Sequence, residues 1–490
     1  MSRQTRRTFL KTAAAATAGT FAANFAIAGA NHRILGANET IHVAVAGIRG
    51  RGSSHIDAFA GMNHVQVTYL VDPDMRTWKE RVKQVERKGK NTPKCVKDIR
   101  EALQDKDLDV VSIATCNHWH SLMTIWACQA GKDVYVEKPC SHNVFEGRKC
   151  VEAAEKYGRI VQHGTQSRGS SSWARQVAAI AGGKYGKLLV SKGYASKIRW
   201  TIGFKPVEEP PADLDFDLWL GPAPKQPYHG NLVPYNWHWF WDTGNGEIGN
   251  QGVHQMDIAR WAIPGGTLPT SVISFGGRWV DEPDYKDQGQ TPNMQMAVMD
   301  FGGTLLVFEV CGLNNKKDPR GTKVFSPKVD NEFYLEEGVI RGGKFFPKGK
   351  DKAEPLVEAK DPHAKRGEQF ANFVECVRSR KREDLNADVL EAHLSSACCH
   401  LPNISHRLGR EVSFDEARRE LGDVPQVQDS LRTIEEYLEG ALGIDTKKIT
   451  GRLGAKLTFD PKAEKFIGNP AADELLTRKP RKPFDVPEKV

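Results

Sequence analysis

The feature that most constrains this chain is a regular alternation of short apolar runs and longer amphipathic segments over residues 40–165. β-Branched runs of this length fit buried strands, and the segments between them have the spacing of helices. Strands joined by helical crossovers pair in parallel, with helices on both faces of the sheet. The pattern therefore predicts an α/β domain, a doubly wound parallel sheet, over residues 38–165. Its strands begin near Ile41, Val65, Asp109, Val134 and Arg159.

A glycine-rich turn, Gly47-Ile48-Arg49-Gly50-Arg51-Gly52, joins the first strand to the first helix. Glycines at such a turn let a pyrophosphate approach the backbone at the helix N-terminus, as in dinucleotide-binding Rossmann domains. Arg49 stands where the usual spacing has its second glycine, so Gly50 is expected to take that role. Arg49 or Arg51 can reach a phosphate. An ordinary βα turn has the same residue types, so the other strand ends must decide.

The second strand ends at Asp72, 20 residues after Gly52. An acidic side chain at this distance accepts hydrogen bonds from the adenosine ribose diol and disfavours a 2′-phosphate. This predicts NAD, with NADP disfavoured. Asp72-Pro73-Asp74 is also typical of a turn and helix cap, and both roles are compatible.

Polar side chains follow the next strands as well, in Thr115-Cys116-Asn117-His118-Trp119-His120 and Glu137-Lys138-Pro139. Carboxyl ends of parallel strands share the edge of the sheet where ligands bind. Singly, such residues are more often caps or surface groups, but together they indicate a ligand crevice. Further candidate cofactor contacts are Thr115, Asn117, His120, Glu137, Lys138 and Gln166.

The N-terminus has the pattern of an export signal. Thr5-Arg6-Arg7-Thr8-Phe9-Leu10-Lys11 is a twin-arginine sequence, and Ala28-Gly29-Ala30 offers a cleavage site after an alanine-rich run. That run is weakly apolar for a membrane span, although a retained anchor stays an alternative. We predict a twin-arginine signal peptide at residues 1–30, the Tat export machinery as a partner and a periplasmic protein. This route exports folded proteins, so a cofactor would be loaded beforehand.

Charge and cysteine content exclude some functions. Residues 1–30 contain four basic and no acidic residues, so their removal lowers the net charge from +8 to +4. No concentrated basic arm is left, which argues against nucleic-acid binding. The nine cysteines have neither CxxC nor Cys/His spacing, which argues against a disulfide scaffold and a metal site. Cys398 and Cys399 are expected in a core.

The regular alternation of strand-like and helix-like segments does not continue in residues 166–410. Strands are expected at 187–194, 294–301 and 303–310, and helices at 252–262 and 363–380. This predicts an α+β domain with a mostly antiparallel open sheet. The charged, proline-containing residues 411–490 are expected to form a C-terminal extension that wraps the surface.

An aromatic-rich stretch precedes the helix that begins near residue 252. Aromatic faces with polar edges suit sugar rings, although most such residues are expected to fill a domain interface, with two or three facing a ligand. Asn250 and His254 are four residues apart and share one face of a helix. Trp237 and Arg168 are further candidate substrate contacts. The stretch contains Trp219, Tyr228, Tyr235, Trp237, His238, Trp239, Phe240 and Trp241.

Together these motifs resemble the Gfo/Idh/MocA family of glucose–fructose oxidoreductase and inositol dehydrogenase, over roughly residues 40–410. The resemblance implies that Lys138 lies beside the nicotinamide and the substrate hydroxyl and that His254 transfers a proton. It also implies oligomerisation, as a dimer or tetramer, through the face of the second sheet. Many members have aspartate where this chain has Asn250. An amide does not titrate, so Lys138 and His254 are the acid–base candidates and Asn250 a positioning group.

The sequence therefore predicts an exported oxidoreductase with tightly bound NAD that transfers hydride to or from a sugar, inositol or related polyol. One alternative is an NAD-dependent glycosidase or lyase. There, oxidation at sugar C3 acidifies the C2 hydrogen, elimination cleaves the glycosidic bond, and reduction returns the hydride. A second alternative is a non-catalytic sugar-binding protein on the same fold.

Overall fold

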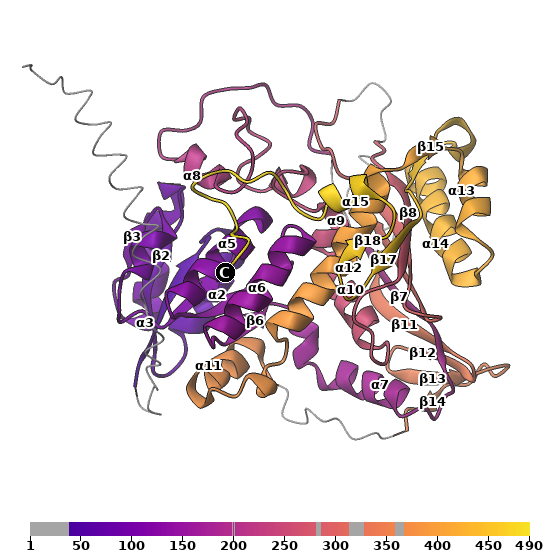
Figure 1. Cartoon of the computed structure of the whole chain (residues 1–490), viewed down its shortest axis with the longest axis horizontal. Coiled ribbons are helices and arrows are strands. Elements are labelled where there is room, and N and C mark those ends of the chain that lie inside the picture. The colour runs from indigo at the N-terminus through magenta and orange to yellow at the C-terminus, as the bar shows by residue number, and fades with distance from the viewer. Residues whose placement is uncertain (1–38, 198, 200, 281–285, 313–327, 358–366) are drawn as a thin grey trace, which may run out of the picture.

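The computed structural model describes residues 39–490 except 198, 200, 281–285, 313–327 and 358–366. The twin-arginine stretch and the start of the predicted helix 363–380 lie outside the described residues. Two sheets lie side by side, and helix α12 (Val389–Arg407) packs between them (Figure 1). Among the described helices, none is long and apolar enough to span a membrane.

The first sheet confirms the predicted doubly wound fold. Six parallel strands have the order β3-β2-β1-β4-β5-β6. Helices α4, α5 and α6 cover one face, and α2 and α3 cover the other. The strands are β1 (Ile41–Ala46), β2 (Val65–Val71), β3 (Lys94–Val96), β4 (Val110–Ile113), β5 (Asp133–Val136) and β6 (Val161–His163), and the helices are α2 (Gly50–Ala60), α3 (Trp78–Gly89), α4 (Ile99–Leu103), α5 (Asn117–Gln129) and α6 (Val144–Lys156).

Helix α11 (Gln369–Ser379) packs on the first sheet, although it follows the second sheet in the chain. Phe370 stacks on Tyr135 with ring centroids 4.5 Å apart, and Phe373 contacts the same tyrosine ring edge-on. The core of the Rossmann domain is therefore completed by a segment more than 200 residues away in sequence, since these contacts join residues 135 and 370.

The second sheet confirms the predicted α+β domain. It is a 12-stranded sheet in which the paired strands of the described residues are antiparallel except β7 with β10. Helices α10 (Gly252–Trp261) and α12 pack on its inner face. Its strands are β7 (Leu188–Ser196), β8 (Ser271–Gly277), β9 (Met294–Asp300), β10 (Leu305–Cys311), β11 (Lys328–Leu335), β12 (Gly338–Arg341), β13 (Lys344–Pro347), β14 (Glu354–Pro355), β15 (Arg410–Val412), β16 (Gly451–Leu453), β17 (Leu457–Asp460) and β18 (Lys465–Phe466).

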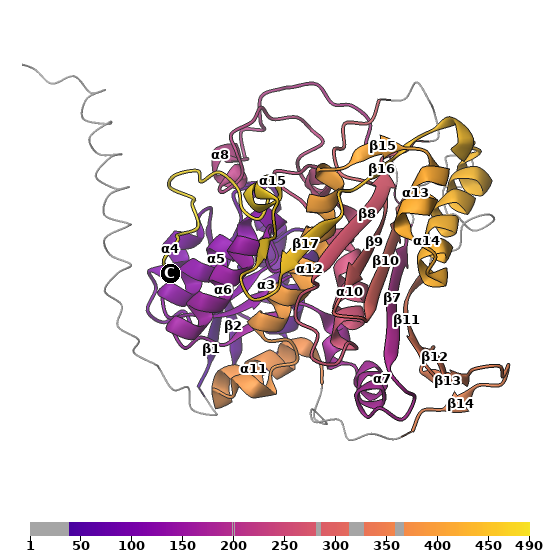
Figure 2. The ribbon, with the colours of Figure 1, turned by 45° about the vertical axis from the view of Figure 1, so that its right-hand side comes forward.

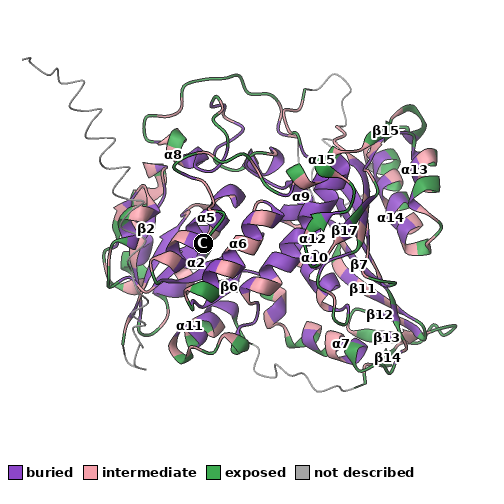
Figure 3. Ribbon diagram, viewed as in Figure 1, coloured by how far each residue is buried: buried purple, intermediate pink, exposed green. Residues whose placement is uncertain are grey.

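The outer face of this sheet is covered in part by the C-terminal extension. Helices α13 (Phe414–Leu421) and α14 (Pro425–Glu436) lie against it (Figure 2). Both helices bury one side and expose the other (Figure 3). The extension is thus part of a hydrophobic core, and it occupies part of the face that the resemblance assigns to oligomerisation.

The end of the chain returns to the Rossmann domain (Figures 1 and 2). After α15 (Pro470–Glu474), Arg478 donates a hydrogen bond to the carbonyl of His118 at 2.8 Å and pairs with buried Glu146 at 2.6 Å. Phe484 packs edge-on against Trp119, with centroids 5.5 Å apart. The tail therefore ties the two domains together from outside.

The buried side of α14 gives a test of this packing. Leu431 is fully buried against the sheet, so Leu431→Ala should lower the free energy of unfolding by about 2–5 kcal/mol. Glu436→Ala, at the exposed end of the same helix, should change it by less than about 0.5 kcal/mol. Urea unfolding, monitored by hydrogen exchange of the peptides that cover α13 and α14, measures the free energy of unfolding of both variants. Equal effects of the two substitutions would contradict this packing.

Candidate active site

A cleft of about 430 Å³ opens at the carboxyl ends of β1, β2, β4 and β5, against the second domain. It holds most of the residues that the sequence singles out. Gly52 and Arg168 are not among the residues that line it. The predicted residues that do are Gly47, Arg49, Gly50, Arg51, Asp72, Thr115, Asn117, His120, Glu137, Lys138, Gln166, Trp237, Asn250 and His254.

The glycines of the turn have separate roles. Gly47 has φ of 77°, and a Cβ there would lie 2.6 Å from the carbonyl oxygen of Ala114. A Cβ on Gly52 would lie 1.8 Å from the carbonyl oxygen of Gly47, so Gly52 packs the helix against the turn. A Cβ on Gly50 would have no neighbour within 4 Å in the described chain. The backbone at Gly50 is therefore open to a bound group, which fits a pyrophosphate.

Two carboxylates stand at the end of β2. Asp72 accepts hydrogen bonds from the backbone amides of Ile48 at 3.0 Å and Asp74 at 2.9 Å. Burial raises the pKa of Asp72 to about 6. Asp74 also lines the cleft, a role not predicted from sequence, and pairs with Arg49 at 2.5 Å and Arg76 at 2.7 Å. Asp72 thus has two roles: its hydrogen bonds to backbone amides hold the glycine turn, and its carboxylate lines the cleft.

The arginines of the turn are paired with carboxylates. Arg49 binds Asp74, and Arg51 donates to Glu137 at 2.6 Å. Glu137 also accepts from Nε2 of buried His55 at 3.1 Å. Burial alone would raise the pKa of Glu137, but the hydrogen bond from His55 and the charge of Arg51 lower it overall. The side of the turn nearest β5 is therefore held by a charged, hydrogen-bonded network.

Lys138 reaches across from β5 to the second domain. Its ammonium donates to the carbonyl oxygen of Asn250 at 2.7 Å and to Asn250 Oδ1 at 3.2 Å. Asn250 ends the short helix α9 (Gly246–Asn250), directly before α10. Burial lowers the pKa of Lys138, while the charges of Glu137 and Glu247 oppose the change. The lysine and the asparagine predicted as catalytic residues are therefore in direct contact.

The ring of His254 lines the same cleft from α10. Within the described residues, no hydrogen bond to the ring nitrogens of His254 is formed. Burial, followed by the charge of Lys138, lowers the pKa of His254 to about 3. The imidazole is therefore neutral near pH 7, and one ring nitrogen is available to accept a proton.

The two histidines of α5 are bound to backbone carbonyls. His120 contacts the carbonyls of Pro139 at 2.6 Å and Thr115 at 3.0 Å, so it joins two strand ends at the wall of the cleft. His118 contacts the carbonyls of Thr243 and Trp219 at 3.2 and 3.0 Å. Because both nitrogens of each ring face carbonyl oxygens, neither histidine is placed to accept a substrate proton.

Of the aromatic-rich stretch, Trp219, Tyr235 and Trp237 line the cleft together with Trp119 from α5, whereas Tyr228, Trp239 and Phe240 are core residues beside it. His238 also lines the cleft, although it was not among the predicted site residues. It stacks on Trp237 with centroids 3.6 Å apart. Its Nδ1 lies 2.6 Å from the carbonyl oxygen of Tyr235, and a carbonyl only accepts. Nδ1 therefore carries the hydrogen, which leaves a lone pair on Nε2.

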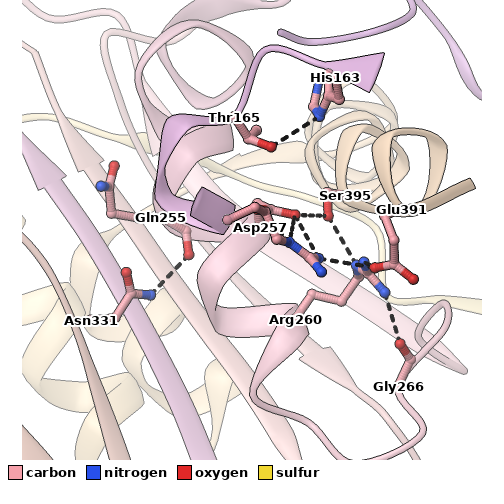
Figure 4. Close-up of polar contacts among 10 residues, drawn as sticks. His163, Thr165, Gln255, Asp257, Arg260, Gly266, Asn331, Glu391 and Ser395 are labelled. Carbon is pink, nitrogen blue, oxygen red and sulfur yellow. Dashed lines mark hydrogen bonds and ion pairs between the residues drawn. The ribbon is translucent and has the colours of Figure 1, made fainter. Parts of the chain in front are cut away.

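Arg168, predicted to contact substrate, instead lies in a buried ionic cluster with Asp257 and Glu391, both of which are labelled in Figure 4. Its guanidinium binds both carboxylate oxygens of Asp257, at 2.9 and 2.8 Å, and contacts Glu391. Arg260 pairs with Glu391 and donates to Ser395, which in turn donates to Asp257. Arg168 therefore supports α10, the helix that carries His254, without lining the cleft.

The carboxylate at Asp72 gives a test of nucleotide binding. We expect Asp72→Ala to weaken NAD binding roughly tenfold to a hundredfold, since it removes a charged acceptor and loosens the turn. Calorimetric titration of nucleotide-free protein with NAD measures the change. Asp105→Ala removes a half-buried turn carboxylate that does not line the cleft and should leave NAD affinity unchanged. If the Asp72→Ala and unsubstituted proteins bind NAD with equal affinity, Asp72 only holds the turn and does not bind the nucleotide.

Solved structures share this fold. GenD2 from gentamicin A biosynthesis, solved with NAD, matches with a TM-score of 0.54 at 16% identity, covering 76% of this chain and 96% of that protein. Levoglucosan dehydrogenase, solved with NADH and L-sorbose, has a TM-score of 0.53 at 16% identity, covering 74% of this chain and 96% of that one. The WlbA dehydrogenase from Bordetella pertussis, solved with NADH and UDP-GlcNAcA, has a TM-score of 0.52 at 16% identity, with coverages of 74% and 97%. At this identity the likeness shows the fold alone.

Curated relatives match a shorter part of the chain. A glycosyl hydrolase family 109 protein of Shewanella baltica is 27% identical over 222 residues, which is 40% of this chain and 47% of that protein. The alpha-N-acetylgalactosaminidase of Shewanella oneidensis is 26% identical over 222 residues, with the same coverages. The chain thus spans about half the length of the curated relatives it matches.

Family models match both domains. Residues 41–165 match the oxidoreductase family's NAD-binding Rossmann fold, and residues 184–273 match the same family's C-terminal alpha/beta domain. These are the two domains that carry Lys138 and His254. Residues 41–165 and 184–273 are therefore similar to the NAD-binding and C-terminal domains of the Gfo/Idh/MocA oxidoreductase family.

Proposed function

We propose that the protein is an NAD-dependent oxidoreductase that transfers hydride to or from a CH–OH carbon of a sugar, inositol or related polyol. The observation that carries the proposal is that Lys138 and the unbonded ring of His254 line the same cleft as the open glycine turn. An acid–base pair beside a dinucleotide site is what oxidation of an alcohol requires.

The residues of the cleft fit a dinucleotide. The open backbone at Gly50 would hold the pyrophosphate, and the carboxylates of Asp72 and Asp74 would hold the adenosine ribose. A nicotinamide bound at the Lys138 end would supply the hydride acceptor or donor. Asp72 has no ion-pair partner among the described residues, and its negative charge would repel a 2′-phosphate. This favours NAD over NADP.

Lys138 and His254 would divide the proton chemistry. The neutral imidazole of His254 would accept the proton of the substrate hydroxyl during oxidation and return it during reduction. The Lys138 ammonium would donate a hydrogen bond to the same oxygen as negative charge develops on it. Asn250 holds that ammonium through two oxygen atoms and so orients it.

The wall around these groups suits a carbohydrate. Trp237 and Tyr235 line the same cleft as Lys138 and His254, and aromatic rings with polar edges pack well against sugar C–H faces. Levoglucosan dehydrogenase and WlbA, whose folds are similar, were solved with L-sorbose and UDP-GlcNAcA, respectively. A carbohydrate or related polyol is therefore the substrate class that we propose. A non-catalytic sugar-binding protein would have no need of a buried lysine–asparagine contact beside a free imidazole.

A glycosidase acting through a transient 3-keto sugar is the second candidate. The glycosyl hydrolase family 109 relatives favour it, and so does His238. Elimination requires removal of the C2 hydrogen by a base in addition to the one that takes the hydroxyl proton. Burial lowers the pKa of His238 to about 3, so its ring is neutral and its Nε2 can accept a proton. The cleft therefore offers two neutral bases, His254 and His238.

Export and assembly are part of the proposal. We infer export through the Tat machinery to the periplasm, with NAD loaded before export, from the twin-arginine pattern at residues 5–11. We also propose a homo-oligomer, formed by surfaces other than the part of the second sheet that α13 and α14 cover.

The proposed activity is tested with the purified full chain. We expect nucleotide released by denaturation to be NAD or NADH in near-stoichiometric amount, and one of a panel of sugars and inositols to change the nicotinamide absorbance. Lys138→Met keeps the apolar stem but removes the donor, and should lower turnover by about 10²–10³-fold while retaining NAD. Failure to bind NAD, or turnover of Lys138→Met within threefold of the unsubstituted protein, would overturn the assignment.

Substitution of His238 distinguishes the two candidate functions, dehydrogenase and glycosidase. Release of aglycone from aryl glycosides without added NAD would show glycosidase activity, and His238→Phe should then lower this release by about 10²-fold or more, as for loss of a general base. If the protein is only a dehydrogenase, no aglycone is released, and His238→Phe should alter KM more than kcat for sugar oxidation. Trp239→Phe, in the neighbouring core, serves as the matched control.

A further inference from the structure

Asn250 is the position at which this chain departs from the family pattern, and its surroundings explain the amide. Its Nδ2 donates to Glu247 Oε2 at 3.3 Å, and its Oδ1 accepts from Lys138 at 3.2 Å. An amide can make both contacts because it carries a donor and an acceptor. An aspartate could not donate to Glu247 and would place a second carboxylate against it.

Glu247 is a buried carboxylate one helical turn before Asn250 on α9. Its side chain is 1% exposed and binds Arg199 at both oxygens, at 3.0 and 2.9 Å. A buried carboxylate is costly unless it is paired and hydrogen-bonded, and here Arg199 and Asn250 supply both. Arg199, Glu247, Asn250 and Lys138 thus form one continuous chain of polar contacts that ends at the ammonium in the cleft.

We propose that Glu247 is a positioning residue of the active site, whose carboxylate holds the Asn250 amide and, through it, the Lys138 ammonium. Glu247 then supplies, from one turn away, the negative charge that aspartate brings in family members that have it in place of Asn250. The effect of Glu247 on turnover rests on the proposed function. The effect of Glu247 on the Lys138 ammonium does not.

The charges around Lys138 give the direction of the effect. Burial lowers the pKa of Lys138, Glu137 and Glu247 raise it, and Arg51 and Arg199 lower it. The histidines that face the same space, His120, His238 and His254, have pKa values lowered by burial and are neutral near pH 7. Removing the charge of Glu247 should therefore lower the pKa of Lys138 further and increase the fraction of free amine.

The free amine is measured by trace labelling with acetic anhydride over a pH series, with mass spectrometry of the peptide that contains Lys138. Glu247→Gln should increase the labelling rate near pH 8 by roughly threefold to tenfold, since one pKa unit is tenfold. Asn250→Asp, which adds a carboxylate, should decrease it. Glu309→Gln removes a buried glutamate paired with Lys192 at 3.6 Å, outside the cleft, and should leave Lys138 labelling unchanged.

The double variant Glu247→Gln/Asn250→Asp is decisive. It keeps the total charge and reverses the direction of the hydrogen bond, because the introduced glutamine amide donates to the introduced aspartate carboxylate. Labelling of Lys138 should return to within about twofold of the unsubstituted protein, and kcat on a sugar turned over by that protein should recover relative to either single variant, with KM changing less. Double-variant labelling equal to that of Asn250→Asp alone would overturn the proposal, and this comparison holds even if Glu247→Gln does not fold.

The labelling result also stands apart from the activity. If the unsubstituted protein turns over no sugar, the proposed function fails. The labelling series still decides whether Glu247 controls the ammonium of Lys138. If turnover is found but labelling does not respond to Glu247, the function holds and this inference alone is wrong.

Discussion

The buried ion pair between Arg168 and Asp257 fixes the geometry on which the site depends. Both side chains are nearly inaccessible, at 5% and 1% exposure. Buried charges are costly unless their hydrogen bonds are complete, and Arg260, Glu391 and Ser395 complete them here (Figure 4). The cluster joins the end of the Rossmann domain to helices α10 and α12. Asp257 lies three residues after His254 on α10, so the cluster sets where that imidazole enters the cleft.

The site exists only where the two domains meet. Lys138 comes from the end of β5, and Asn250 and His254 come from α9 and α10. A second contact across the interface, from Asn117 to Asn245 at 2.9 Å, lies on the same side of the sheet edge. Because these contacts are short and directional, a small rotation of one domain would break the lysine–asparagine contact. The C-terminal tail and α11, which both return to the Rossmann domain, resist such a rotation.

Local patterns predicted the parts of this molecule whose structure is decided locally. The βα rhythm, the glycine turn, and the lysine and histidine of the cleft each lie within a short stretch that carries its own signal. Glu247 and Asp74 could not be assigned from sequence, because their partners Arg199 and Arg49 are 48 and 25 residues away. His238 was missed for a different reason: its partners Trp237 and Tyr235 are its neighbours in the chain, and the aromatic stretch does not show which of its side chains line the cleft. Distance along the sequence also explains why Arg168 was predicted to contact substrate. A charged residue after a strand end fits a substrate contact until its buried partner, 89 residues later, is known.

Burial determines how protons can be handled in this cleft. It lowers the pKa of His254 and of His238 to about 3, so both rings are neutral acceptors, while Lys138 keeps two carboxylates, Glu137 and Glu247, near its ammonium. The cleft thus combines the neutral imidazoles of His254 and His238 with the charged donor Lys138. Oxidation of an alcohol releases one proton to a base, and His254 suffices for that. A second neutral base has a chemical use only if a second proton is removed from the same sugar, as elimination at C2 requires. Whether His238 takes a proton or only binds a hydroxyl therefore distinguishes the two reactions that we propose for this site.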